Sequence, residues 1–253
     1  MVRDYEEDVN DNYQRAFSGL AADLPDGELN EFGPLTAVAS GLDVRLFNRI
    51  FAFQAPASEE LAAAVRWLTE RDLPFRVTST DAAVGKIESL AHDVELVRSE
   101  ESTPGMVRPS LAEVPALTSD VDIIEVRTVE ELNAFVTVVA AVFGMPVAVT
   151  DQVYQTAVHA DRDRLFVGRV DGEAAACGLL IRTGDVAGVY TIGVREPYRR
   201  RGLGESMTQA VLRAGREAGC RIGVLQSSEM AVPLYEQMDF KPAVTYHHFE
   251  PIS

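Results

Sequence analysis

One short segment combines glycines and arginines in a spacing that suits anion binding. It follows an expected strand that ends at Val194, and it opens an expected helix. Two glycines two residues apart let the backbone approach a ligand closely, and successive amides at a helix N-terminus attract negative charge. The arginines add positive charge, so the segment predicts a cradle for a diphosphate. Its residues are Arg199, Arg200, Arg201, Gly202, Leu203 and Gly204.

Other phosphate-binding motifs fit this segment poorly. A P-loop ends in Gly-Lys-Ser/Thr, which is absent from the sequence. A dinucleotide fingerprint needs a third glycine inside a parallel βαβ unit, whereas the strand expected here closes an antiparallel meander. Taken alone, Arg-x-x-Gly-x-Gly is also compatible with a solvent-exposed turn. The elements around it therefore decide its meaning.

The second half of the chain predicts strands in mostly antiparallel order. Thr128 and Glu131 form a capping box for the first helix. Asp171-Gly172 between two apolar runs predicts a hairpin. The expected elements are strand 123–127, helices 128–144 and 150–159, strands 165–170, 174–181 and 186–194, helix 204–218, strand 222–226, helix 231–238 and strand 244–249.

The first half predicts a smaller α/β unit. Residues 1–40 are polar and irregular, with a short helix expected at 13–24. Residues 99–119 hold three prolines, one glycine and many serines and threonines, and are expected to be a linker. We therefore expect domains at 1–118 and 119–253. The other expected elements are strand 45–53, a helix capped by Ser58, strand 75–78, helix 81–91 and strand 94–97.

Composition narrows the class of protein. Hydrophobic residues make up 47% of the 253, so a disordered chain is excluded. With 39 acidic and 23 basic residues the net charge is −16, which disfavours general binding to nucleic acid or to an anionic membrane. No apolar run reaches the roughly 18 residues of a membrane span, and no secretory signal is evident, so we expect a cytoplasmic protein. Two cysteines give neither a disulfide framework nor a zinc quartet, and no metal is expected.

The charged residues have an unusual balance. Only Lys86 and Lys241 are lysines, and the other basic residues are arginines. A high acid load with so little lysine favours a halophilic type of acidic protein, in which salt screens self-repulsion. A GC-rich genome that favours arginine codons is the alternative.

The cradle and the order of elements over residues 121–250 together resemble the GNAT superfamily of acyl-CoA-dependent N-acyltransferases. Arg199, Gly202 and Gly204 match its Arg/Gln-x-x-Gly-x-Gly/Ala motif. Residues 234–240, Leu-Tyr-Glu-Gln-Met-Asp-Phe, resemble its Leu-Tyr-Glu-x-x-Gly-Phe signature. Residues 226–235 resemble a subgroup that often has a degenerate GNAT-like half in front. The resemblance implies an α+β fold with a mostly antiparallel central sheet flanked by helices, preceded by a degenerate half that does not bind CoA.

The resemblance also implies roles for single residues. The pyrophosphate of acetyl-CoA would lie on the cradle, and its pantetheine arm would lie beside the preceding strand. Ser228 stands where many members place an asparagine that touches the cofactor, and Tyr235 matches the tyrosine that protonates the departing thiolate. The implied cofactor-binding residues are Ile192, Gly193, Val194, Arg199, Arg200, Arg201, Gly202, Leu203, Gly204 and Ser228.

The reaction implied is direct attack of a neutral primary amine on the thioester of acetyl-CoA. Glu229, Asp185 or a water chain could take the proton of the amine. Alternatives are a non-catalytic acyl-CoA sensor, or a transferase with another acyl group or acceptor. The sequence leaves the acceptor and the choice between monomer and homodimer open.

Three residues mark places where this sequence departs from the family or allows two interpretations. Asp239 replaces the usual glycine of the signature, so either the turn differs or the aspartate adopts an unusual φ. Glu205 follows the cradle, where small or hydroxyl residues are common, and could weaken CoA binding. Tyr190 could line the acceptor pocket or belong to the core.

Overall fold

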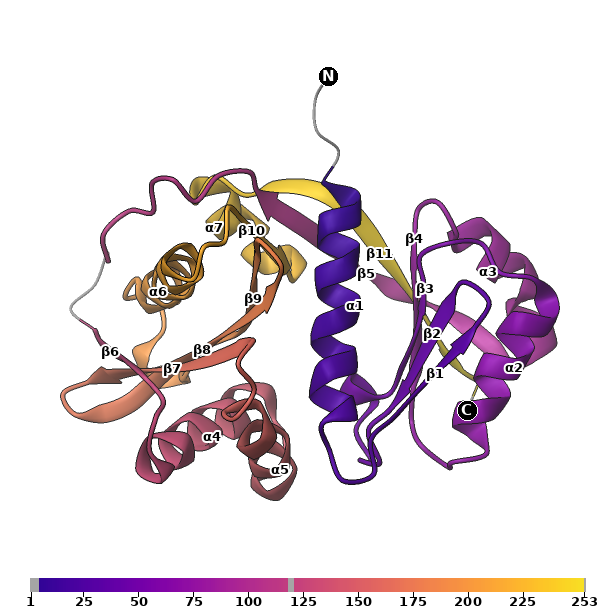
Figure 1. Cartoon of the computed structure of the whole chain (residues 1–253), viewed down its shortest axis with the longest axis horizontal. Helices are drawn as coiled ribbons and strands as arrows, with labels where there is room; N and C mark the ends of the chain where they lie inside the picture. Colours follow the sequence, from indigo (N-terminus) through magenta and orange to yellow (C-terminus); the bar gives the residue numbers. More distant parts are fainter. Residues whose placement is uncertain (1–4, 118–120, 253) are drawn as a thin grey trace.

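The computed structural model describes residues 5–117 and 121–252, and within these ranges the strands form one sheet (Figure 1). In chain order they are β1 (Glu28–Phe32), β2 (Leu35–Ala39), β3 (Arg49–Ala52), β4 (Arg76–Thr80), β5 (Leu96–Arg108), β6 (Asp122–Glu125), β7 (Asp163–Val170), β8 (Glu173–Thr183), β9 (Val186–Val194), β10 (Ile222–Gln226) and β11 (Lys241–Pro251). Their order in the sheet is β1-β2-β3-β4-β11-β5-β10-β9-β8-β7-β6. Among the described pairs, β3–β4 and β9–β10 are parallel and the rest antiparallel, which confirms the predicted fold class.

Helices cover both faces of this sheet. Helices α2 and α3 pack on one face of the first-half strands, α6 and α7 on one face of the second-half strands, and α1, α4 and α5 on the opposite faces. No helix in the described ranges combines the length and apolar character that crossing a bilayer requires. The helices are α1 (Glu6–Ala22), α2 (Ser58–Thr69), α3 (Val84–Ala91), α4 (Val129–Phe143), α5 (Val147–Ala157), α6 (Leu203–Glu217) and α7 (Val232–Gln237), with 3-10 turns η1 (Arg45–Phe47), η2 (His92–Val94), η3 (Glu196–Tyr198) and η4 (Glu229–Ala231).

The two halves of the chain repeat one order of elements. Each has three antiparallel strands, a helix, a strand parallel to the third, another helix and a final strand. The first series is β1, β2, β3, α2, β4, α3, β5, and the second is β7, β8, β9, α6, β10, α7, β11. The final strands are exchanged: β5 pairs with β10, β11 pairs with β4, and the two pair with each other at the centre of the sheet.

This exchange overturns the expected linker at 99–119. Residues 99–108 belong to β5, a central strand of the sheet. Its first part alternates weakly because many of its side chains are exposed and polar, and Pro104 lacks an N–H. Pro104 nevertheless pairs with Thr245 of β11, and its carbonyl accepts from the amide of Ser227 at 2.9 Å. The expected domain boundary at 118/119 lies outside the described residues.

The expectation of irregular structure over residues 1–40 is also wrong. Helix α1 begins at Glu6, and β1 and β2 form a hairpin. The buried face of α1 includes Val9, Tyr13, Ala16 and Leu20, whose spacing is helical, but polar Asn12 is buried among them and blurs the pattern. The apolar stripe is therefore weak in its first turns, and the sequence predicts too short a helix.

The second half follows its prediction more closely. The capping box is present, since Thr128 accepts from the amide of Glu131 at 3.2 Å and the Glu131 carboxylate accepts from Thr128 at 2.9 Å. The hairpins β7–β8 and β8–β9 form as expected. Helix α5 begins at Val147 rather than at Thr150, because Pro146 supplies its N-terminal boundary.

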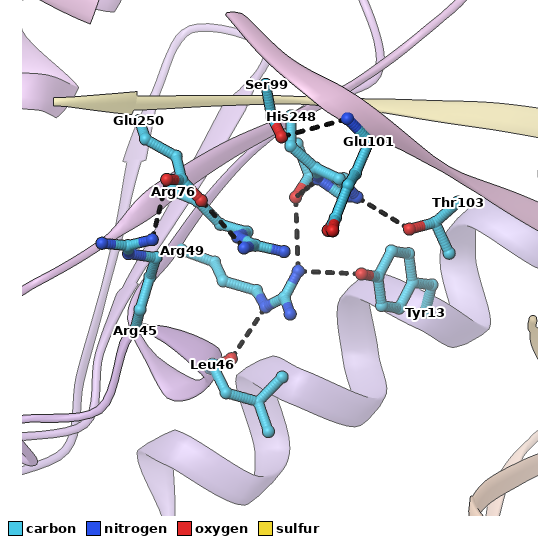
Figure 2. Close-up of polar contacts among 11 residues, drawn as sticks. Tyr13, Arg45, Leu46, Arg49, Arg76, Ser99, Glu101, Thr103, His248 and Glu250 are labelled. Carbon is cyan, nitrogen blue, oxygen red and sulfur yellow. Dashed lines mark hydrogen bonds and ion pairs between the residues drawn. The ribbon is translucent and has the colours of Figure 1, made fainter. Parts of the chain in front are cut away.

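A buried polar cluster fastens α1 to the first-half sheet (Figure 2). The Arg49 side chain, in a residue only 3% exposed, donates to Leu46 O at 2.8 Å, the Tyr13 hydroxyl at 2.8 Å and Thr78 Oγ1 at 3.3 Å. Burial lowers the pKa of Arg49. Nearby His248 contacts Thr78 and Thr103, and burial lowers the pKa of His248 to about 3, so its ring is neutral. Hydrogen bonds therefore hold α1 against this face of the first-half sheet.

Candidate functional site

The predicted cradle lies where β9 ends and α6 begins. Arg200 (φ 59°) and Gly202 (φ 76°) adopt left-handed conformations, and Gly202 caps α6. A Cβ added to Gly204 would meet only Val194 Cγ2 at 3.9 Å and Leu234 Cδ2 at 4.0 Å, so the space beside this backbone is open. The first amides of α6 have no acceptor within the helix, as at every helix N-terminus. Backbone of this shape fits an anion.

Charge around the cradle is positive although the whole chain is acidic. Arg199, Arg200 and Arg201 are exposed, and in the part of the chain that the structure describes none forms an ion pair. Arg199 Nε donates to Val194 O at 3.1 Å. The Glu205 carboxylate accepts from Gln209 at 3.0 Å, one turn further along α6. The Glu205 carboxylate is therefore hydrogen-bonded to a residue of its own helix.

Strands β9 and β10 separate next to the cradle. They pair only through 186–188 of β9 and 222–224 of β10. Beyond Gly188, β9 continues to Val194 without a described partner on the β10 side. An extended ligand can add to such a free strand edge by main-chain hydrogen bonds. The predicted contact residues Ile192 and Val194 are half-buried on this edge.

The separated part of β9 also contains a bulge. Cys177 of β8 pairs with Gly193 and Leu179 pairs with Tyr190, so Gly178 faces both Thr191 and Ile192. A Cβ on Gly193 would lie 2.9 Å from Val142 Cγ1 and 3.2 Å from a ring carbon of Phe143. The end of α4 therefore packs directly on the bulge.

Tyr235 is connected to the cradle through α6. Its side chain is buried, packs edge-to-face on Phe240 and hydrogen-bonds with Thr208, whose hydroxyl donates to Gly204 O at 2.9 Å. Burial raises the pKa of Tyr235, so the phenol holds its proton at neutral pH. Ser228 is exposed and precedes η4, where its carbonyl accepts from Ala231. The structure places Tyr235 beside the helix that follows the cradle. Ser228 lies across the gap between β9 and β10, just after the end of β10.

The structure decides two alternatives that the sequence left open, those at Asp239 and Tyr190. Asp239 adopts the unusual positive φ, 63°, and buried Arg108 lies beside it, with Nη2 3.5 Å from Oδ2 of Asp239 and Nη1 donating to Met238 O at 3.0 Å. Tyr190 is 8% exposed and donates to Asn12 Oδ1 of α1 at 2.7 Å, so it belongs to the core.

The candidate bases differ in position. Asp185 precedes β9 and pairs with Arg221. The strand rise places it about 20 Å from Thr191, away from the separated end. Glu229 lies in η4, after the end of β10. A cavity of about 860 Å³ lies elsewhere, between α4, α5 and Asp23.

The comparisons with known proteins agree with this geometry. Residues 140–240, which include the cradle, the bulge and Tyr235, match the model of the Acetyltransferase (GNAT) family. This segment therefore resembles a GNAT acetyltransferase. None of the curated proteins searched matches the chain. This match supports a general acetyltransferase role.

Solved structures extend the likeness in fold to the whole chain. A GCN5-related N-acetyltransferase from Kribbella flavida has a TM-score of 0.73 at 18% identity, covering 97% of this chain and 96% of that one. A putative GNAT acetyltransferase from Novosphingobium aromaticivorans has a TM-score of 0.60 at 15% identity, over 93% and 97%. A tandem GNAT protein from the clavulanic acid biosynthesis pathway has 0.62 at 14%, over 96% and 94%. The likeness in fold thus includes the first half of the chain.

Sequence reasoning missed the residues that support the separated strand. Thr191 has φ 52°, and Tyr154 of α5 reaches its hydroxyl at 3.1 Å. Helix α1 contributes Asn12 to the same strand through Tyr190. The β8–β9 register could not be read from apolar alternation, because a bulge shifts that alternation by one residue.

Proposed function

We propose that this chain is an N-acetyltransferase that uses acetyl-CoA as the acyl donor and a primary amine as the acceptor. The observation that carries the proposal is the adjacency of two features at one end of β9. An open glycine turn begins α6, its arginines form no ion pair with the described residues, and a strand edge without a described β10 partner precedes it. A diphosphate and an extended amide-containing arm are two of the parts of CoA, and each of these features suits one of them.

The donor would be bound mainly by backbone groups. Amides of Gly202, Leu203 and Gly204 would hold the pyrophosphate, with the guanidinium groups of the preceding arginines around it. The pantetheine arm would pair with β9 at Ile192 and Val194. Ser228, across the gap, would contact the arm from the β10 side. The thioester would then lie near the bulge at Thr191.

The chemistry would be a direct transfer. The amine nitrogen attacks the thioester carbonyl carbon, the C–S bond breaks, and the thiolate takes the proton of the Tyr235 phenol. The proton lost by the amine passes through water to the Tyr235 phenolate and restores the phenol. A raised phenol pKa keeps Tyr235 protonated until the thiolate forms. Of the carboxylates considered as base, Glu229 lies nearer the separated end of the strands than Asp185 does.

The first half would not bind a second CoA. Its β3–α2 turn lacks a glycine pair, and Glu60 of α2 occupies the helix N-terminus by accepting from the amide of Ala57 at 2.7 Å. A carboxylate at that place repels a diphosphate. We infer that this half is a degenerate copy of the second, which its order of elements supports.

Calorimetric titration of acetyl-CoA tests the proposal, at low and at molar salt. We expect binding of micromolar strength that Gly204→Glu abolishes, because the new carboxylate would enter the open cradle without requiring positive φ. Gly85→Glu is the matched control: it adds the same charge on α3, where nothing lies within 4 Å. No binding by the unaltered protein in either salt would overturn the proposal.

Turnover separates the enzyme from a binding module. Thiol release from acetyl-CoA is followed with a panel of primary amines, and acyl chains of increasing length compete for the donor site. Binding without amine-dependent thiol release would identify an acyl-CoA sensor instead. Tighter binding of a longer acyl chain would replace acetyl as the donor group.

A further inference from the structure

The backbone of β9 is strained at one residue that carries a β-branched side chain. Thr191 has φ 52°, in the left-handed region. It is the first of the two residues opposite Gly178 in the β8–β9 bulge. A bulge with a left-handed first residue normally has glycine there, because a branched side chain clashes with its own backbone in that conformation. Something other than intrinsic preference must therefore hold Thr191 in place.

Two side chains from different elements hold it. The Tyr154 hydroxyl of α5 lies 3.1 Å from Thr191 Oγ1, and the Cys177 thiol of β8 donates to Thr191 O at 3.2 Å. Tyr154 is 3% exposed, and its ring packs edge-to-face on Phe135 with centroids 4.9 Å apart. Burial raises the pKa of Tyr154 and of Cys177, so both act as neutral hydrogen-bonding groups.

This clamp determines which way one peptide group faces. In a trans peptide the C=O of Thr191 and the N–H of Ile192 point in opposite directions. Because that carbonyl is directed at the Cys177 thiol, the amide of Ile192 is turned away from that thiol. An amide fixed in this way is a preorganised donor for negative charge that develops on an oxygen beside it.

We propose that Tyr154 is a positioning residue: together with Cys177 it holds Thr191 left-handed and so aims the Ile192 amide at the thioester oxygen of a bound acyl-CoA. This inference rests on the proposed function. Tyr154 itself touches neither the donor nor the acceptor. Its hydroxyl acts through Thr191. The amino-acid sequence gives no sign of this contact, because α5 and β9 are distant in the chain.

The test uses Tyr154→Phe, which removes the hydroxyl and leaves the packed ring. We expect the rate of thiol release at saturating acetyl-CoA to fall roughly tenfold to a hundredfold, as expected when an oxyanion donor is displaced. The calorimetric Kd for acetyl-CoA should change less than about threefold, since the cradle is untouched. The acceptor is the fastest amine of the panel, or water where no amine is faster.

A second substitution separates positioning from general stability. Thr191→Gly adopts positive φ without strain and has no hydroxyl for Tyr154 to hold. In that background, adding Tyr154→Phe should change the rate less than about twofold, because the clamp no longer has a role. Tyr246→Phe is the matched control: it removes a buried phenol that donates to Asn10 at 2.8 Å, outside the clamp, and should leave the rate unchanged.

The outcomes are distinct. If Tyr154→Phe has the unaltered rate, or if its effect is equally large in the Thr191→Gly background, the positioning role is wrong. If the unaltered protein binds no acetyl-CoA, the proposed function fails and this inference fails with it. Equal losses in Tyr154→Phe and Tyr246→Phe would show a stability effect and would also overturn the inference.

Discussion

The two halves of the chain share an order of elements, yet only the second opens its sheet. In the first half, β3 pairs with β4 along its whole length, from Arg49 to Ala52. In the second, β9 and β10 pair over three residues and then diverge. The same topology thus gives either a continuous sheet or a gap between two strands, depending on how far the two parallel strands remain paired.

The turns that follow β3 and β9 also differ between the halves: the second leaves a helix N-terminus open and the first fills it. In the second half, a left-handed glycine begins α6, and the helix N-terminus is left to a ligand. In the first half, Glu60 fills the N-terminus of α2. A helix N-terminus is satisfied either by the chain itself or by a bound anion, so a capping carboxylate and an anion site exclude each other.

The largest effect on the rate is expected from the difference between α7 and α3, the helices before the final strand of each half. Helix α7 carries Tyr235, whereas α3, at the corresponding place in the first half, has no tyrosine. Tyr235→Phe should lower kcat roughly a hundredfold or more, with an acetyl-CoA Kd close to that of the unaltered protein, because the phenol is needed only when the thiolate leaves. Thiol release and calorimetry measure the two quantities.

A rate unchanged by Tyr235→Phe would assign the proton donor to water. Loss of acetyl-CoA binding together with the rate would show that the hydroxyl supports α6 through Thr208 instead.

Sequence alone predicted the fold of the second half and those parts of the candidate site whose residues are consecutive in the chain. The cradle lies within six consecutive residues, and glycine, arginine and helix signals are readable there. The bulge was not readable, since it depends on Tyr154 and Cys177, which are brought to Thr191 by packing. The exchange of β5 and β11 was hidden for a similar reason: polar residues of β5 resemble a linker until a partner strand covers them.

Buried charge also distinguishes the halves. The first half buries Arg49 with three hydrogen-bond acceptors, but Asp163 at the start of β7 has a fully buried carboxylate whose oxygens find no described hydrogen-bond donor. Arg162 Nε lies 3.4 Å away. Burial raises the pKa of Asp163 from 3.8 to about 7. The second half therefore carries a pH-dependent cost that the first avoids.

Asp163→Asn should reveal this cost. With a folded-state pKa above the unfolded value, the native state keeps the proton that the unfolded chain loses, so stability falls as pH rises from about 4 to about 7. An asparagine side chain cannot ionise, and between pH 5 and pH 8 the variant should lose about 3 kcal/mol less stability than the unaltered protein. Urea unfolding at pH 5 and pH 8 measures the difference. An unchanged pH slope would show that Arg162 neutralises the carboxylate fully.

The smallest expected effect concerns the closed helix of the first half. Glu60→Ala removes the carboxylate that accepts from Ala57, and the free energy of unfolding should fall by about 1 kcal/mol, as for loss of other helix caps. It should not create a second CoA site, because the N-terminus of α2 has Ala57 and Glu59 at the positions of Gly202 and Gly204, and β3 stays paired with β4. Calorimetry in the Gly204→Glu background, where only the first half could bind, measures this directly. Acetyl-CoA binding by the double variant would mean that a vacant helix N-terminus suffices, and that neither the glycine turn nor the separated strands set the halves apart.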